Sequence, residues 1–311
     1  MLGLAEKAIA KWPVTVKSIS FAAHRENAVF RVAALEGDFA LRLHRQGYRT
    51  DAELQSELQF MAALAEAGIG APTPVASHKG LHVEQQDQTQ VSLLTWLSGR
   101  PLGATGVPLD LPDRLGTFER LGHLIATMHN ATDAWQQPQG FTRQAWGLDG
   151  LLGEQPQWGR FWENPFLKPE EQAVLRQVRD KLCKDLASRS FDMGLIHADL
   201  VSENILLDGD RLRIIDFDDS GWGYRLQDIA TALVKHEAES DFTVLKQALF
   251  EGYRSRRALN TTDVETFLLL RHLSYVGWIV PRMSGEMGRQ QCGRFISNAV
   301  AKAQTYLEVE D

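Results

Sequence analysis

The sequence of 311 residues predicts an α+β fold with two lobes: a small N-terminal lobe with an antiparallel β-sheet and one helix, and a larger, mainly helical C-terminal lobe. Residues 14–43 are rich in β-branched and aromatic residues, which favours strands. Long amphipathic helical patterns begin only after about residue 111. Between them, glycines and prolines cluster in residues 97–108, as is typical of a connection. We therefore assign residues 1–97 to the first lobe and residues 98–311 to the second.

The first lobe begins with strand-like runs, and Glu36-Gly37-Asp38 is a hairpin turn signal between the second and the third. Apolar residues then recur every three or four positions from Asp51 to Ala67, which predicts a helix. Gly68 ends it. Two further strand-like runs follow, around Pro74–His78 and Val91–Trp96.

The second lobe is predicted to be helical except for a β-rich insert at residues 194–220. Arg271 and His272 interrupt its most apolar stretch, Phe267–Val280, which is too short and too charged to span a bilayer and so predicts a buried helix. The predicted helices cover about residues 111–130, 169–189, 225–238, 242–258, 262–280 and 292–308.

Composition narrows the function classes. Apolar residues make up 44% and charged residues 23%, as in ordinary globular proteins. The 33 Lys and Arg residues are fewer than the 40 Asp and Glu residues, so a nucleic-acid partner is not expected. Cys183 and Cys292 fit no metal-ligand spacing, and the N-terminal residues lack a signal-peptide core. We expect a cytoplasmic protein with no membrane partner; the sequence does not indicate its oligomeric state.

The β-rich insert carries the most informative motif. An apolar run precedes the loop His197-Ala198-Asp199-Leu200-Val201-Ser202-Glu203-Asn204, and a second run follows it. The turn at Asp208-Gly209-Asp210 then returns the chain to Asp216. Because a hairpin brings its two ends together, we expect Asp199 and Asn204 to lie close to Asp216. A polar loop whose Asp and Asn side chains cap turns is the alternative interpretation.

These residue types suit phosphoryl transfer. Such a reaction needs a carboxylate near the acceptor hydroxyl and oxygen ligands that hold Mg²⁺ against phosphates. We expect Asp199 to be the catalytic base and Asn204 and Asp216 to be metal ligands, with Asp218 near the metal or the acceptor. His197 is expected to support the catalytic loop through hydrogen bonds.

This H-x-D-x-x-x-x-N loop, followed by the strand end Ile215-Asp216-Phe217, resembles the aminoglycoside phosphotransferase and choline kinase family. The resemblance extends over most of the chain, and the run Arg42–Tyr48 is most similar to the homoserine-kinase-like and stress-response kinase branch. It implies a bilobal protein-kinase-like fold, the cofactors ATP and Mg²⁺, and a small-molecule hydroxyl acceptor such as an amino alcohol, homoserine or an aminoglycoside.

The resemblance also implies nucleotide-binding residues. Arg42 stands where the family usually has a lysine, and Glu57 stands at the position of its ion-pair partner; Glu53, one turn earlier, is the competing partner. No G-x-G-x-x-G precedes the second strand, so Asn27, with His24 or Arg25, would take over contact with the phosphates. The segment around Leu94 and Trp96 would offer backbone groups to adenine.

Alternative functions are a Ser/Thr protein kinase of the stress-response type and a nucleotide-binding regulator without turnover. No A-P-E motif follows Asp216, which argues against a conventional protein kinase. Asp228 is expected to cap a helix N-terminus and to brace the catalytic loop through backbone N–H groups.

Overall fold

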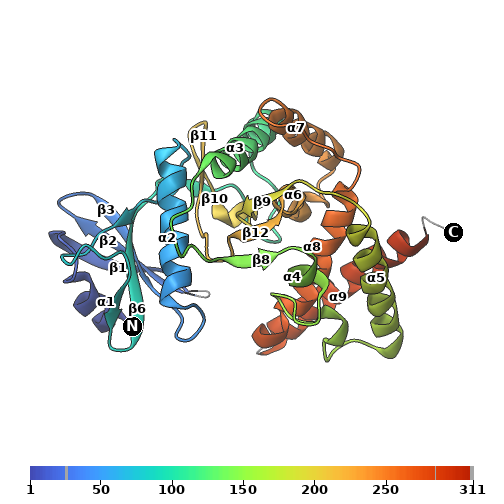
Figure 1. Ribbon diagram of the computed structural model, residues 1–311, viewed down its shortest axis with the longest axis horizontal. Coiled ribbons are helices and arrows are strands. Elements are labelled where there is room, and N and C mark those ends of the chain that lie inside the picture. Colours follow the sequence, from blue (N-terminus) through green and yellow to red (C-terminus); the bar gives the residue numbers. More distant parts are fainter. Residues whose placement is uncertain (25–26, 284, 309–311) are drawn as a thin grey trace. The chain divides into compact units, whose positions relative to one another are not determined.

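The computed structural model of the protein describes residues 1–24, 27–283 and 285–308. Contacts divide them into two compact units, which are described one at a time (Figure 1). Unit 1 consists of Met1–Leu102, Ala134–Arg143 and Asn204–Asp218. Unit 2 consists of Gly103–Asp133, Gln144–Glu203 and the described residues from Asp219 onward. Two later segments therefore belong to the N-terminal unit. The lobe boundary predicted between residues 97 and 98 placed both of them in the second lobe.

Unit 1 contains two β-sheets, with long and very short strands, and two helices. Its elements are α1 (Leu2–Ile9), β1 (Val16–His24), β2 (Ala28–Ala34), β3 (Asp38–Leu43), α2 (Asp51–Glu66), β4 (Pro74–Val75), β5 (Glu84–Gln86), β6 (Thr89–Thr95), β7 (Arg100–Pro101), β10 (Ile205–Asp208) and β11 (Arg211–Ile214). The main sheet is antiparallel in the order β1-β2-β3-β6-β4, and β5 also pairs with β6. The second sheet has the order β11-β10-β7. The predicted antiparallel sheet and its helix are confirmed, whereas α1 was not predicted.

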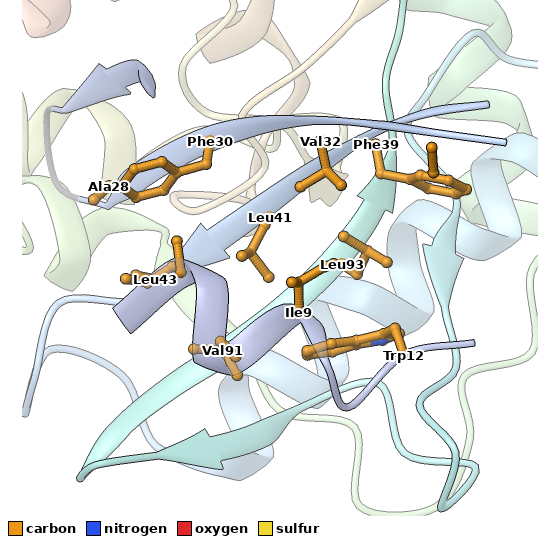
Figure 2. Packing of buried hydrophobic residues seen from close by; sticks show 13 residues of the cluster. Ile9, Trp12, Ala28, Phe30, Val32, Phe39, Leu41, Leu43, Val91 and Leu93 are labelled. Carbon is orange, nitrogen blue, oxygen red and sulfur yellow. The ribbon is translucent and has the colours of Figure 1, made fainter. Parts of the chain in front are cut away.

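The core of the main sheet lies under α1. Figure 2 shows Ile9 and Trp12 facing Leu41 and Leu93, all of them at most 5% exposed. The indole Nε1 of Trp12 donates to the carbonyl of Val75 at 2.8 Å, so the buried ring keeps its hydrogen bond. Burying one large apolar side chain contributes about 1.5–3 kcal/mol. A short helix without strong caps is thus stabilised by the sheet it covers.

Helix α2 has a sequence-encoded start and stop. The Thr50 hydroxyl accepts from the backbone N–H of Glu53 at 3.2 Å, and the Glu53 carboxylate accepts from the N–H of Thr50 at 2.9 Å, which forms a capping box. Gly68, with φ of +82°, follows the end of the helix. One face is buried and carries Glu57 together with the predicted apolar residues Leu54, Leu58, Met61 and Leu64.

Aromatic packing holds the two later segments of unit 1 against α2. Phe60 of α2 stacks on Trp135, with ring centroids 5.9 Å apart, and meets Phe217 edge-to-face at 5.7 Å. The N–H of Ile214 donates to the carbonyl of Gly70 at 2.7 Å. These contacts place the end of the β10–β11 hairpin beside α2 and the turn that follows it.

Unit 2 is mainly helical, as predicted, with one small sheet in the order β8-β12-β9. Helix α6 is shorter than predicted, and α9 begins at Gly285 rather than near residue 292. No helix in the described residues is both long and apolar enough to cross a bilayer. The elements are α3 (Arg114–Ala134), β8 (Gln144–Trp146), α4 (Leu148–Leu152), η1 (Phe161–Glu163), α5 (Pro169–Ala187), β9 (Met193–Ile196), η2 (Ser202–Asn204), β12 (Gly221–Tyr224), α6 (Arg225–Leu233), η3 (Val234–His236), α7 (Phe242–Arg254), α8 (Val264–Trp278), η4 (Val280–Arg282) and α9 (Gly285–Glu308).

Candidate functional site

Unit 1 contains a buried ion pair between strand β3 and helix α2. Arg42 Nη1 donates to Glu57 Oε1 at 2.5 Å, and the two residues are 6% and 0% exposed. Burial disfavours both charges, but the carboxylates of Glu57, Asp218 and Asp216 raise the pKa of Arg42. Arg42 and Arg143 in turn lower the pKa of Glu57 to about 2. The predicted pairing is present; the competing partner, Glu53, is engaged in the helix cap instead.

A third buried charge, Arg143, joins α2 to the segment after β11. Its Nη1 donates to the carbonyl of Glu53 at 3.0 Å, and its Nη2 donates to the carbonyls of Phe217 at 3.0 Å and Asp218 at 2.6 Å. Nη1 also lies 3.9 Å from Glu57 Oε2. The sequence carries no signal for this role, since Arg143 belongs to no motif. Its partners in α2 and in the segment after β11 are 74 or more positions away from it.

The segment after β11 presents two carboxylates in different surroundings. Asp216 is exposed and has φ of +67°, in the left-handed region that non-glycine residues rarely adopt. Asp218 is 5% exposed, and neither of its carboxylate oxygens accepts a hydrogen bond from the described residues. Arg42 Nη2 and Arg49 Nη2 each lie 3.9 Å from this carboxylate. Burial, with the charge of Glu57, raises the pKa of Asp218 to about 6.

The hairpin places Asn204 beside this segment. Ile205 is in register with Ile214, and the N–H of Ile215 donates to the carbonyl of Asn204 at 2.9 Å. Asn204 therefore lies next to the residue that precedes Asp216, as the hairpin pattern predicts.

The residue types at this site are those that bind magnesium, and binding of the ion stays a prediction. Asn204, Asp216 and Asp218 offer amide and carboxylate oxygens, which Mg²⁺ prefers, and the oxygens of Asp218 are buried without hydrogen-bond donors. Within the described residues, no group of three or more His, Cys, Asp or Glu side chains forms a complete metal site. A site for Mg²⁺ does not require one, because phosphates and waters supply the remaining ligands.

In unit 2, a buried aspartate binds the backbone of the loop that follows β9. The N–H groups of His197 and Ala198 donate to the carboxylate of Asp228 at 2.9 and 2.7 Å. Ala198 has φ of +69°, a strained backbone that needs such support. His197 Nδ1 lies 3.3 Å from the N–H of Asp199, which fits the predicted supporting contact.

The role predicted for Asp228 is confirmed in one part and wrong in the other. It braces the loop, but it does not cap α6, since Tyr224 occupies the N-cap position and Asp228 lies in the first turn. His129 Nε2 lies 3.0 Å from Asp228 Oδ2, and its Nδ1 lies 2.8 Å from the Tyr253 hydroxyl. Although burial opposes it, the hydrogen bond from His129 lowers the pKa of Asp228, and burial lowers the pKa of His129. With Asp228 as the acceptor, His129 Nε2 is the donor of this hydrogen bond.

The other end of the loop is held by side chains from η3. Ser202 Oγ lies 2.9 Å from His236 Nε2, and Lys235 Nζ donates to Glu203 Oε2 at 2.7 Å. Burial disfavours the charge, but the hydrogen bond from Lys235 lowers the pKa of Glu203 to about 2. The loop thus has defined anchors on both sides of Asp199.

Asp199 itself contacts a residue that the sequence analysis did not propose for the site. Arg271 Nη2 of α8 donates to Asp199 Oδ1 at 2.5 Å. A signal was present, because Arg271 interrupts the most apolar stretch of the chain, and a charge in a buried helix needs a partner.

The predicted nucleotide contacts are placed in unit 1 as follows. Asn27 is 9% exposed, and its Oδ1 accepts from the N–H of Arg45 at 3.2 Å, so it supports the chain after β3; Arg25 lies outside the described residues. Leu94 is 3% exposed within β6. The guanidinium of Arg31 lies over the ring of Trp96 at 5.2 Å. Contact of these residues with a nucleotide stays a prediction.

Asp199 belongs to unit 2, whereas Asn204, Asp216 and Asp218 belong to unit 1. The predicted convergence of Asp199 with these metal ligands therefore stays a prediction.

Comparison with known proteins identifies the family. A sequence profile of the phosphotransferase enzyme family matches residues 18–260. Homoserine kinase of Sinorhizobium medicae (strain WSM419) is 28% identical over 272 residues, which are 83% of this chain and 76% of that protein. The structure of a microcompartment-associated aminopropanol kinase is similar with a TM-score of 0.84 and 28% identity, covering 99% of this chain and 98% of that chain. The amicoumacin kinase hAmiN, with a TM-score of 0.79 and 23% identity over 97% of this chain and 93% of that chain, shares the fold.

These similarities confirm the kinase-like α+β fold and the family that the catalytic loop and the Ile215–Phe217 strand end indicated. The profile spans most of the chain, and the related proteins are named as kinases. The chain therefore belongs to the phosphotransferase enzyme family, as a kinase that transfers a phosphoryl group to an alcohol.

Proposed function

We propose that this kinase uses ATP and Mg²⁺ to phosphorylate a hydroxyl group of a small metabolite. The observation that carries the proposal is the braced catalytic loop, in which the buried Asp228 carboxylate holds the backbone of His197 and Ala198 immediately before Asp199. A rigid loop serves proton transfer, because a base acts only when it is held within hydrogen-bond reach of the proton that it accepts.

In this proposal Asp199 accepts the proton of the acceptor hydroxyl, and His197 supports the loop. Catalysis of phosphoryl transfer is mostly positioning and charge stabilisation, so one well-placed carboxylate is sufficient as a base.

Unit 1 would bind the nucleotide. The Arg42 guanidinium, held by Glu57, would contact the phosphates, with Asn27 at the adjacent turn. Backbone groups near Leu94 and Trp96 would contact adenine. Arg presents a planar fork where a Lys would present a point charge, so its contacts with phosphate oxygens would be bidentate.

Asn204, Asp216 and Asp218 would hold Mg²⁺. The ion would neutralise charge that develops on the transferred phosphoryl group. The solved structure of the related hAmiN is a complex with AMP-PNP and Ca²⁺, which supports both a nucleotide and a divalent cation.

The relatives support a proposal for the acceptor class. Homoserine and aminopropanol, which appear in the names of two relatives at 28% identity, are both small amino alcohols. We therefore propose an amino alcohol, homoserine-like or aminoglycoside-like acceptor.

The test is an ATP-turnover assay with Mg²⁺ over a panel of amino alcohols, homoserine and aminoglycosides. Asp199→Ala is expected to lower turnover by about 10²–10⁴-fold and to leave ATP binding intact. Asp216→Ala is expected to abolish the Mg²⁺-dependent part of ATP binding in calorimetry. Near-normal turnover of Asp199→Ala would refute the base assignment, and autophosphorylation without metabolite turnover would favour a protein acceptor.

A further inference from the structure

A buried arginine contacts the candidate base from a helix that lies 72 positions further along the chain. Arg271 belongs to α8 and is 2% exposed, and its Nη2 donates to Asp199 Oδ1 at 2.5 Å. Most of α8 is buried and apolar, so this charge stands in surroundings that disfavour it.

Two aromatic rings fix the guanidinium of Arg271. It lies 4.3 Å from the ring centroid of Trp158 and 4.6 Å from that of Tyr275. Such cation–π contacts offset part of the cost of burial and hold the planar group in one orientation. The hydrogen bond to Asp199 therefore has a defined direction.

Stability does not explain an arginine at this position. Replacing a buried ion pair by apolar residues of similar volume is often neutral or stabilising, because burying both charges is costly. Asp228 already holds the backbone before Asp199, and Lys235 holds the side chain of Glu203 after it. The contact of Arg271 is instead with the side chain of Asp199, whose orientation the backbone anchors do not set.

We propose that Arg271 is a positioning residue for Asp199: it holds the carboxylate in the orientation that accepts the proton of the acceptor hydroxyl. This inference rests on the proposed kinase function and adds a residue to it. A displacement of about 1 Å of a reacting group is sufficient to lower a rate by about 100-fold. The gain in rate from a fixed carboxylate therefore explains why a buried charge is retained here.

The first experiment compares Arg271→Met and Arg271→Lys in the full-length protein, with aminopropanol and homoserine as acceptors. We expect Arg271→Met to lower kcat by at least about 30-fold with the KM for ATP within about twofold of the unsubstituted enzyme. Arg271→Lys, which keeps one charged donor, is expected to recover most of the loss. If Arg271→Met does not fold, Arg271→Gln replaces it, with the same expected loss of kcat.

Arg114→Met is the matched control. Arg114 of α3 also pairs with carboxylates from a distant segment, Glu239 at 2.9 Å and Asp241 at 2.5 Å, which lie between η3 and α7. Its loss is expected to lower the melting temperature and to leave kcat unchanged. Equal loss of kcat in both variants would show that Arg271 acts only on folding.

The second experiment combines Arg271→Met with Asp199→Ala. If Arg271 acts through Asp199, adding Arg271→Met to Asp199→Ala leaves the residual ATP turnover unchanged. Multiplied effects, or normal kcat in Arg271→Met, would overturn this inference while Asp199→Ala still tests the base. Absence of turnover by the unsubstituted enzyme with every acceptor would overturn the proposed function, and this inference with it.

Discussion

Two buried aspartates, one in each unit, differ in how their charges are satisfied. Asp228 of unit 2 is 0% exposed and accepts hydrogen bonds from two backbone N–H groups and from His129, and its pKa is lowered. Asp218 of unit 1 is 5% exposed, has no hydrogen bond to its oxygens from the described residues, and has its pKa raised to about 6 by burial.

This difference in hydrogen bonding suggests that one carboxylate is structural and that the other binds a ligand. A buried carboxylate with all its hydrogen bonds formed stabilises the fold, whereas one without them costs free energy. Such a cost is tolerated where a ligand later provides the missing partners. We therefore interpret Asp228 as part of the scaffold and Asp218 as part of the nucleotide and metal site.

The largest expected effect is that of Asp228→Asn on stability. The amide keeps one acceptor oxygen and turns its NH2 group towards the donors that the other oxygen served, so at least one buried hydrogen bond is lost without replacement. We expect the free energy of unfolding to fall by about 3 kcal/mol. Urea denaturation followed by circular dichroism measures it. An unchanged midpoint would mean that the loop is held by other contacts.

Asp218→Asn is expected to weaken ligand binding without lowering stability, in contrast to Asp228→Asn. The free energy of unfolding is expected to be unchanged or slightly higher, because a buried carboxylate whose oxygens accept no hydrogen bond is removed. The Mg²⁺-dependent affinity for ATP is expected to fall by at least about tenfold, since one oxygen ligand loses its charge. Calorimetry with and without Mg²⁺ measures this. Normal affinity together with higher stability would remove Asp218 from the site.

The pH dependence of stability tests the raised pKa of Asp218. An aspartate whose folded-state pKa is raised above its ordinary value stabilises the fold at low pH and loses that contribution as pH rises towards the raised pKa. With the pKa of Asp218 near 6, the stability of the unliganded enzyme relative to Asp218→Asn is expected to fall by about 1 kcal/mol from pH 5 to pH 7. Denaturation of both proteins at the two pH values tests this, and parallel profiles would contradict the raised pKa.

The smallest effect is expected for Glu53→Ala. Glu53 belongs to the capping box of α2, so its loss is expected to lower stability by about 0.5–1 kcal/mol and to leave ATP affinity unchanged. Glu57→Ala, one turn further along the helix, is expected to weaken ATP binding through Arg42. Equal effects on ATP affinity would mean that Glu53 shares the role of Glu57.

Local patterns in the chain were sufficient to predict the strands of the N-terminal sheet, helix α2 with its end at Gly68, and the hairpin between Asn204 and Asp216. These features depend on neighbours within a few residues, or on two adjacent elements, so a period of 2 or 3.6 residues reveals them. The Arg42–Glu57 pair was instead implied by the resemblance to the kinase family, unlike these strands, this helix and this hairpin.

Long-range packing decided the rest. Helix α1 is stable because the sheet buries Ile9 and the nearby Trp12. The parallel pairing of β8 with β12 joins residues 77 positions apart, such as Gln144 and Gly221. The partners of Arg143 and Arg271 come from elements that no short pattern links to them. A buried arginine can be recognised in a sequence by its apolar neighbours, but the carboxylate or carbonyl that compensates its charge is chosen only when the chain folds.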